Sequence, residues 1–502
     1  MIRISTLSSA MLTLAALFAL GGCSLAPKYE RPAAPVPEVW PDHAGTQARA
    51  GAAGSAAADI GWARFFGDPR LRALIALGLE NNRDLRTALL RVEQARAQYR
   101  IERAQLLPAV GASGSGARAR TPADLSSTGQ SFTGGEYRAG GALAAYEIDL
   151  FGRVRSLKAT ALETWLATEE ARRAAQLSYI STLAAQYLAE RSAGEQLALA
   201  RQTLALVEDS HRLIKHRHDH GIATELDLRT AEAQVAGARA AAAESTRLLD
   251  QARNGLAYLV GAALPADLPP ALPLDNQALI ADLPAGLPSD LLQRRPDILQ
   301  AEHTLRSANA SIGAARAAFF PSITLTAFGG TGSAALDGLF KDGSGAWSFA
   351  PQITLPIFTG GRNRANLDAA QIQKRIEIAA YEKAIQAAFR EVADGLAARA
   401  SYDEQLAAQQ AQVAASRARY ELSNARYRGG VADYLAVLTA QQDLFAAQQG
   451  LIRSRALHLT SLVDLYKALG GGWVEKSEGP EADNKPPAAT FADTATPPFL
   501  FR

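Results

Sequence analysis

Tyr427-Arg428-Gly429-Gly430-Val431-Ala432-Asp433-Tyr434 separates two long runs in which apolar residues recur every three or four positions. The run before it contains Ile378, Tyr381, Ile385, Phe389, Val392 and Leu396, and then Leu406, Val413, Tyr420 and Tyr427. The run after it contains Leu435, Leu438, Leu444, Leu457 and Leu465. This spacing predicts two long helices. Gly429-Gly430 predicts the reversal between them, because glycine tolerates the backbone angles of a turn.

A second hairpin of the same kind lies earlier in the chain. Gly221 precedes Gly430 by 209 positions. At this offset residues 152–261 align with residues 361–470 without a gap, and their apolar positions coincide. An internal repeat of this length predicts a repeated architecture. Each arm of about 65–70 residues would span roughly 100 Å at ~1.5 Å per residue. The alternative is two unrelated coiled-coil hairpins.

The composition excludes several functional classes. A net charge of +2 in 502 residues gives no support for nucleic-acid binding. A single cysteine excludes an intramolecular disulfide and a cysteine-based metal cluster. The sequence has no HExxH motif, nucleophile elbow or P-loop, and the glycines of Gly111–Gly116 lack phosphate-loop spacing. We therefore expect no enzyme, no cofactor and no metal site.

The chain start resembles a bacterial lipoprotein precursor. Residues 1–22 contain a basic start and a short apolar run that ends in Leu20-Gly21-Gly22, directly before Cys23. The resemblance implies that residues 1–22 are a signal peptide and that Cys23 carries diacylglycerol and N-acyl lipid. Ser24, rather than aspartate, then favours delivery to the outer membrane. The alternative is an ordinary secretory signal followed by an incidental cysteine.

The rest of the chain divides at changes in composition and periodicity. The predicted segments are a lipid-anchored tether (23–67), repeat 1 (68–263, strands about 110–120 and 137–150, hairpin 152–261), a proline-rich connector (264–293), repeat 2 (294–470, strands about 322–333 and 347–357, hairpin 361–470) and a disordered tail (471–502). Each repeat is therefore expected to contain a helix, two strands and two long helices.

Alternation in the first repeat predicts two faces for its second strand. One face carries Tyr137, Ala139, Gly141, Leu143, Ala145, Glu147 and Asp149, and the other carries Arg138, Gly140, Ala142, Ala144, Tyr146 and Ile148. Four strands do not close a barrel, and open sheet edges are not tolerated in lipid. Three chains with four strands each would form a 12-stranded barrel with a lumen. The alternative is a small soluble sheet packed on helices.

Five stretches together resemble one family. They are Pro27–Pro32, Trp62–Leu71, Arg91–Arg96, Leu287–Ile298 and Leu465–Trp473. The chain resembles the outer-membrane factor lipoproteins of bacterial tripartite efflux systems, of the NodT kind. The resemblance implies a mainly α chain with a membrane β-barrel. It implies a homotrimer with a 12-stranded outer-membrane barrel on a periplasmic α-helical barrel, working as a passive exit duct. The implied partners are a periplasmic adaptor and an inner-membrane pump of the resistance-nodulation-division class.

The resemblance also implies a gate at the helical tips. Tyr427 and Arg428 match the family's tip tyrosine and arginine, and Asp227 matches an acid that accepts such a bond. We hypothesise that Tyr427 and Arg428 bond to acids of the outer hairpin and keep the duct shut. The alternative is that they only cap helix ends.

The turns of the two tips are expected at Gly221 and at Gly429-Gly430. The sequence departs from the family at the usual acidic ring, where Ala436 and Thr439 stand. Leu435 is a candidate apolar constriction, and its alternative role is buried packing. Asp433 lies near the turn and has the alternative role of a helix cap.

Four histidines cluster near the outer tip: His211, His216, His218 and His220. His216 and His220 have metal-ligand spacing on a helix, but no third ligand is evident, so we expect no metal there. Two functions compete with the efflux duct. One is an exit duct for type I protein secretion, and the other is a coiled-coil structural lipoprotein without transport.

Overall fold

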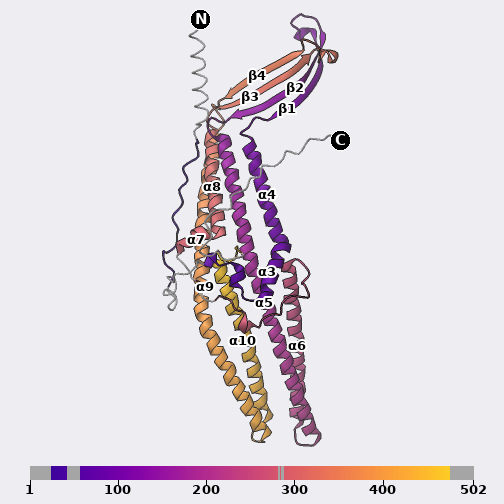
Figure 1. Ribbon diagram of the computed structural model, residues 1–502, viewed down its shortest axis with the longest axis vertical. Helices are drawn as coiled ribbons and strands as arrows, with labels where there is room; N and C mark the ends of the chain where they lie inside the picture. Colours follow the sequence, from indigo (N-terminus) through magenta and orange to yellow (C-terminus); the bar gives the residue numbers. More distant parts are fainter. Residues whose placement is uncertain (1–23, 42–56, 281–282, 284–287, 475–502) are drawn as a thin grey trace.

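The fold is elongated, with the strands at one end and two helical tips at the other (Figure 1). A computed structural model describes residues 24–41, 57–280, 283 and 288–474. Its first repeat contains α3 (Pro69–Asn81), α4 (Arg83–Ala104), β1 (Val110–Thr121), β2 (Phe132–Ile148), α5 (Arg153–Asp219) and α6 (Glu225–Val260). Its second contains α7 (Pro288–Arg294), α8 (Pro296–Ala317), β3 (Ser322–Ser333), β4 (Gly345–Thr354), α9 (Arg362–Arg428) and α10 (Tyr434–Ala468). Short helices lie at α2 (Trp62–Phe65), η2 (Ala57–Asp59), η3 (Ala123–Leu125), η4 (Leu274–Asn276) and η5 (Leu336–Gly338).

The repeat seen in the sequence is present in the backbone. α5 and α9 are both 67 residues long. Glycines with positive φ stand at matching positions before and after each hairpin: Gly152 and Gly361 before, Gly261 and Gly470 after. A side chain would strain the backbone at these positions, so glycine fixes where each long helix starts and stops.

Both tips have the same turn. Gly221 and Gly430 each have a φ of 73°. The next residue bonds back to the helix in each tip, Ile222 N to Arg217 O at 2.8 Å and Val431 N to Arg426 O at 3.0 Å. The sequence predicts Gly429 as a turn residue together with Gly430. In the structure Gly429 has a φ of −80° and is the C-cap of α9. Only Gly430 therefore requires glycine for the reversal of the inner tip.

The strands form one antiparallel sheet in the order β1-β2-β3-β4. β2 begins at Phe132, earlier than predicted, because Phe132 pairs with Thr121 at the end of β1. β4 covers Gly345–Thr354 instead of 347–357, because its ladder ends where Thr354 pairs with Ser322, the first residue of β3.

A β-bulge in β2 changes the predicted faces of this strand after Leu143. The register shifts between Leu143 and Tyr146, and Ala145 has a φ of 48°. The extra residue moves Tyr146 and Ile148 to the face of Leu143. These side chains then join Ile323 and Leu325 of β3, which pair with Ile148 and Tyr146. This face of the sheet is therefore apolar over the part where Leu143, Tyr146 and Ile148 lie beside Ile323 and Leu325.

The main hydrophobic core lies at the middle of the molecule, around α3, α5, α8, α9 and α10. The rings of Phe65 and Tyr466 stack with centroids 3.9 Å apart. Asp68 caps α3 by accepting a bond from Arg70 N at 2.8 Å, and its other oxygen accepts a 2.6 Å bond from the buried Tyr187 hydroxyl. The start of repeat 1 is thus fixed against the first long hairpin.

The start of the predicted tail is ordered. Gly471 and Gly472 are buried, and Trp62 N donates to Val474 O at 3.0 Å. The Arg173 guanidinium lies 5.4 Å from the centre of the Trp473 ring. The prediction of a disordered tail from residue 471 is therefore wrong for residues 471–474, because the Trp473 ring and the Val474 carbonyl have partners in the fold. The remainder of the tail, residues 1–22 and Cys23 lie outside the described residues.

The segment 24–41, which we call the N-terminal strap, runs along α8. Asn309 and Arg316 of α8 donate to the carbonyls of Pro27 and Leu25, at 2.8 Å and 3.0 Å. Arg31 pairs with Glu302, whose side chain is only 3% exposed, through bonds of 2.7 Å and 3.1 Å. The strap is therefore held by a buried carboxylate as well as by backbone contacts.

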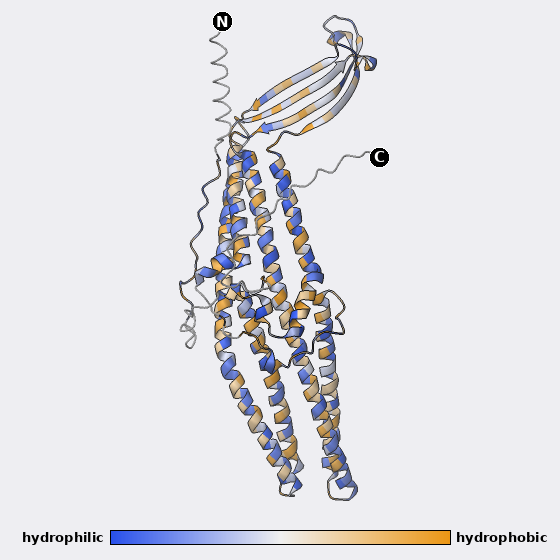
Figure 2. Ribbon diagram, viewed as in Figure 1, coloured by the Kyte–Doolittle hydropathy of each residue, from blue (hydrophilic) through white to orange (hydrophobic). Residues whose placement is uncertain are grey.

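Apolar residues recur along each long helix between polar ones, instead of forming one unbroken apolar segment (Figure 2). Among the described residues, no helix combines the length and apolar character needed to cross a membrane. The long helices are therefore amphipathic elements that pack against one another.

We predict that the strap loosens in acid. Burial alone would raise the pKa of Glu302, but hydrogen bonds and charges from Arg306 and Arg31 outweigh it and lower the pKa below 4.5. The ionised carboxylate therefore stabilises the strap above pH 4.5, and this stabilisation is lost as the pH falls through the lowered pKa. Hydrogen exchange of residues 24–41, corrected for its intrinsic pH dependence, should rise over that fall.

Glu302→Gln should raise exchange in residues 24–41 at pH 7 and remove the acid-dependent increase. Glu244→Gln is the matched control, because Glu244 lies on α6 with a side chain 66% exposed. Unchanged exchange in the strap of Glu302→Gln at neutral pH would contradict the role given to this carboxylate.

Candidate functional site: the hairpin tips

The inner hairpin (α9 and α10) touches the outer hairpin (α5 and α6) through a small apolar cluster close to the tips. We call it the tip cluster: buried Ile214, Ala231, Tyr434, Val437 and Leu438, with Ala223, Tyr420 and Tyr427 packed against them. The two tips lie at the same end of the molecule (Figure 1). The cluster therefore joins the hairpins at the end where a gate was predicted.

Tyr434 is the central side chain of the tip cluster. It is 6% exposed, and its ring centroid lies 5.4 Å from that of Tyr427. Burial raises the pKa of Tyr434 to about 12, with smaller contributions from Tyr427, Tyr420 and Asp227. Sequence reasoning gave Tyr434 no role, because its partners Ile214 and Ala231 lie on the other hairpin.

The candidate latch residues lie near this contact but do not form the hypothesised bond. The Asp227 carboxylate accepts bonds from Thr224 N at 3.0 Å and from the Thr224 hydroxyl at 2.7 Å, in a capping box of α6. Tyr427 reaches the outer hairpin through Arg217, whose guanidinium lies 5.1 Å from its ring centre. Arg428 is the last residue of α9. Within the described chain, the contact between tips is made by apolar and aromatic packing and by the Arg217 guanidinium against the Tyr427 ring.

The other two gate candidates lie at the start of α10. Asp433 is its N-cap, and its carboxylate accepts a 3.0 Å bond from Ala436 N. The structure therefore gives Asp433 the capping role that was the alternative in the sequence. Leu435 is 65% exposed, so it is not a packing residue of the isolated chain.

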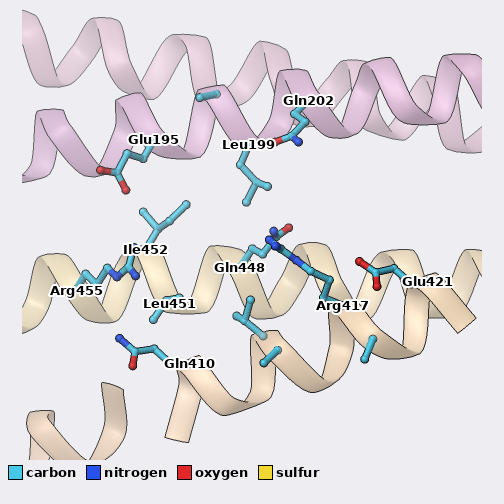
Figure 3. A pocket seen from close by; sticks show the side chains of 14 residues that line it. Glu195, Leu199, Gln202, Gln410, Arg417, Glu421, Gln448, Leu451, Ile452 and Arg455 are labelled. Carbon is cyan, nitrogen blue, oxygen red and sulfur yellow. The ribbon is translucent and has the colours of Figure 1, made fainter. Parts of the chain in front are cut away.

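Two grooves follow the line where α5 meets α10. The first, which we call the charged groove, has a volume of about 720 Å³ and includes Glu195, Arg417, Glu421 and Arg455. Side chains of α5 and α10 face each other across it (Figure 3). Glu195 also accepts a 2.8 Å bond from Leu274 N of the connector. The second groove, lined by α5, α6 and α10, contains no charged residue.

Three of the four histidines near the outer tip, His216, His218 and His220, contact neighbouring groups. The rings of His216 and His220 stack with centroids 4.3 Å apart, and His220 Nδ1 lies 2.8 Å from His216 O. His218 Nε2 lies 3.0 Å from a Glu225 oxygen. In the part of the chain that is described, no three acidic, histidine or cysteine residues form a metal-binding group.

Comparison with known proteins gives the family. The family model described as outer membrane efflux protein matches residues 74–262 and 287–471. The chain therefore belongs to the outer membrane efflux protein family, and it is an outer-membrane protein.

Individual relatives match over almost the whole chain. The toluene efflux pump outer membrane protein TtgC of Pseudomonas putida is 50% identical, over 92% of this chain and 95% of its own length. Outer membrane protein OprJ of Pseudomonas aeruginosa is 47% identical, over 91% of this chain and 94% of its own. The open-state crystal structure of the MtrE outer membrane channel of Neisseria gonorrhoeae superposes with a TM-score of 0.83 at 43% identity, covering 91% of this chain and 100% of MtrE.

We predict that Tyr434→Ala releases the inner tip from the outer hairpin. Replacing a buried aromatic side chain by alanine typically lowers stability by about 3–5 kcal/mol. Here the loss falls on a cluster of few residues. Hydrogen exchange at the start of α10 should rise, whereas exchange in the central core should not change. Leu435→Ala, one residue further and 65% exposed, is the matched control. Equal effects of the two variants would contradict the role of Tyr434 in joining the hairpins.

Proposed function

We propose that the chain is the passive outer-membrane exit duct of a tripartite efflux pump, assembled as a homotrimer. The observation that carries this proposal is a four-stranded sheet with two open edges at the end of two paired hairpins of equal arm length. Open edges are excluded from lipid, so the sheet has to be completed by other chains. Three chains supply twelve strands, which is enough for a lumen.

The helices support the same assembly. α8 packs against both α5 and α9, whereas its counterpart α4 packs against α5 and contains no buried residue. Leu90 and Ile101 of α4 are more than half exposed, as are Ile372 and Ile376 of α9. By the symmetry of the repeat, α9 of a neighbouring copy would cover α4 as the chain's own α5 covers α8.

The apolar face of the sheet supports insertion into the outer membrane. Trp347, Phe349 and Ile353 alternate along β4 and are 81%, 60% and 69% exposed. Ser348 and Gln352 lie between them on the opposite face. This alternation is the pattern of a strand with one face toward lipid and the other toward a polar lumen.

The proposed partners follow from the family. They are a periplasmic adaptor at the tips, an inner-membrane pump of the resistance-nodulation-division class, and the outer membrane, with Cys23 as the lipid anchor. The relatives' names support small toxic compounds as cargo, since they mention toluene and antibiotics. The duct itself needs no catalytic residue, because the pump supplies the energy.

We predict that Phe349→Arg prevents assembly in the membrane and that Ser348→Arg does not. An arginine facing lipid costs about 2–4 kcal/mol at the bilayer centre, whereas a lumen-facing one changes selectivity instead. The measurement is the fraction of heat-modifiable trimer in outer membranes, followed by single-channel recording in planar bilayers. Trimers of the Ser348 variant should form pores with altered ion preference.

A chain that forms no pore as a wild-type trimer would favour the coiled-coil structural lipoprotein. Pores with no change in drug susceptibility on deletion, but lost protein export, would favour type I secretion. Both results would contradict the efflux proposal in different ways.

The latch stays a proposal for the assembled trimer. Tyr427→Phe combined with Arg428→Ser should raise single-channel conductance above the closed-state level, because both side chains would lose polar partners on outer-hairpin acids such as Asp227. Arg426→Ser, two residues before Arg428 in the same last turn of α9, is the control. Conductance of the double variant at the wild-type closed level would remove the latch.

A further inference from the structure

The groove without charges lies between α6 and α10, directly beside the tip cluster. It has a volume of about 490 Å³, within the range of sites that hold small molecules. Thr230, Gln234, Gly237 and Ala241 face it from α6 at helical spacings of four and three, so they lie on one side of that helix. The α6 side of the groove is therefore a continuous surface of small and amide side chains.

The opposite side of the groove comes from both hairpins and combines apolar side chains with the uncharged polar residues Thr203, Thr439, Gln441 and Gln442. Val207 of α5 is 5% exposed and Leu438 of α10 is 3% exposed, and Phe445 of α10 supplies an aromatic ring further along. A charged molecule would lose hydration here without meeting an opposite charge. The lining therefore selects for neutral molecules, in contrast to the charged groove of Figure 3.

Gln441 gives the groove a specific polar feature. The side chain lines the groove and is 8% exposed, yet its Nε2 atom is buried without a hydrogen-bond acceptor. A buried amide N–H without a partner destabilises the protein, and an acceptor atom delivered by a ligand removes that cost.

We propose that this groove is a binding site for neutral, mainly apolar aromatic molecules that carry a carbonyl or hydroxyl oxygen. The rings lie against Leu438 and Phe445, and the oxygen accepts a hydrogen bond from Gln441 Nε2. The site deepens the proposed duct function by giving the chain a contact with a class of cargo, but binding to it requires neither a pump nor an open channel.

Photolabelling with benzophenone tests the site, because this probe has two rings, no charge and one carbonyl acceptor. The experiment uses the full-length protein in lipid nanodiscs, with mass spectrometry to locate the labelled residues. Labelling of α6 residues 230–241 and α10 residues 435–445 should saturate with concentration and fall with excess acetophenone.

Two variants and one matched control separate the site from general adsorption. Gln441→Leu should raise the benzophenone concentration that gives half-maximal labelling at least tenfold, because leucine cannot donate a hydrogen bond to the carbonyl. Gly237→Leu should abolish labelling by filling the groove, since a Cβ at Gly237 meets no atom within 4 Å. Gln448→Leu makes the same change in the charged groove and should have no effect.

Labelling that does not saturate, or that is equal in all four proteins, would overturn the proposal. Absence of labelling in the wild type would overturn it too, since it would mean that a neighbouring chain or the protein's own side chains fill the groove. Either result leaves pore formation by the same nanodisc protein untouched, so failure of the site is distinguishable from failure of the duct.

Discussion

The contact between α5 and α10 is the interaction on which the placement of the two hairpins depends, because it joins the outer hairpin to the inner hairpin along their length. At the middle of the molecule this contact belongs to a core that includes Phe65, Tyr187, Tyr381 and Tyr466, all nearly or fully buried. Near the tips the hairpins are joined only by the tip cluster and by Arg217 against the Tyr427 ring, among the described residues. Between Leu396 and the inner tip, none of the described residues of α9 is fully buried. The hairpins are thus fixed at the centre and lightly held at the end.

This distribution of burial suits a duct with a gate at its tips. Segments with few buried contacts open at low free energy, whereas a central core with many buried rings stays closed. The strap, the connector and residues 471–474 all add contacts at or above the centre. The chain therefore concentrates stability where the hairpins need a fixed base and leaves their ends free to separate.

Much of the fold could be predicted because long helices and exact repeats leave strong periodic signals. The glycine tip, the paired hairpins and the four strands all follow from local spacing in the sequence. The bulge at Ala145 could not be predicted, because it depends on how β2 pairs with β3 and not on β2 itself. The burial of Tyr434 could not be predicted for a similar reason, since its partners Ile214 and Ala231 come from the other hairpin.

The sequence predicted where the candidate site lies, at the hairpin tips, but not which side chains contact each other there. Family resemblance directed attention to Tyr427, Arg428 and Asp227, whereas the described chain joins its tips through Tyr434 and through Arg217 stacked on Tyr427. A resemblance transfers residue identities, but it does not transfer which neighbour a side chain meets. Asp227 shows this, because one oxygen of its carboxylate caps α6 by accepting two bonds from Thr224 of the same tip.

The central claim is that the inner tip is held to the outer hairpin by a few buried side chains below a fixed core. Electron–electron distance measurement between spin labels at Ile222→Cys and Val431→Cys, two exposed and equivalent positions of the tips, in trimers with one doubly labelled chain, tests it most directly. The account predicts one narrow distribution that becomes broad and longer with Tyr434→Ala, while a label pair across the central core does not change. A narrow, unchanged distribution in the Tyr434 variant would contradict it.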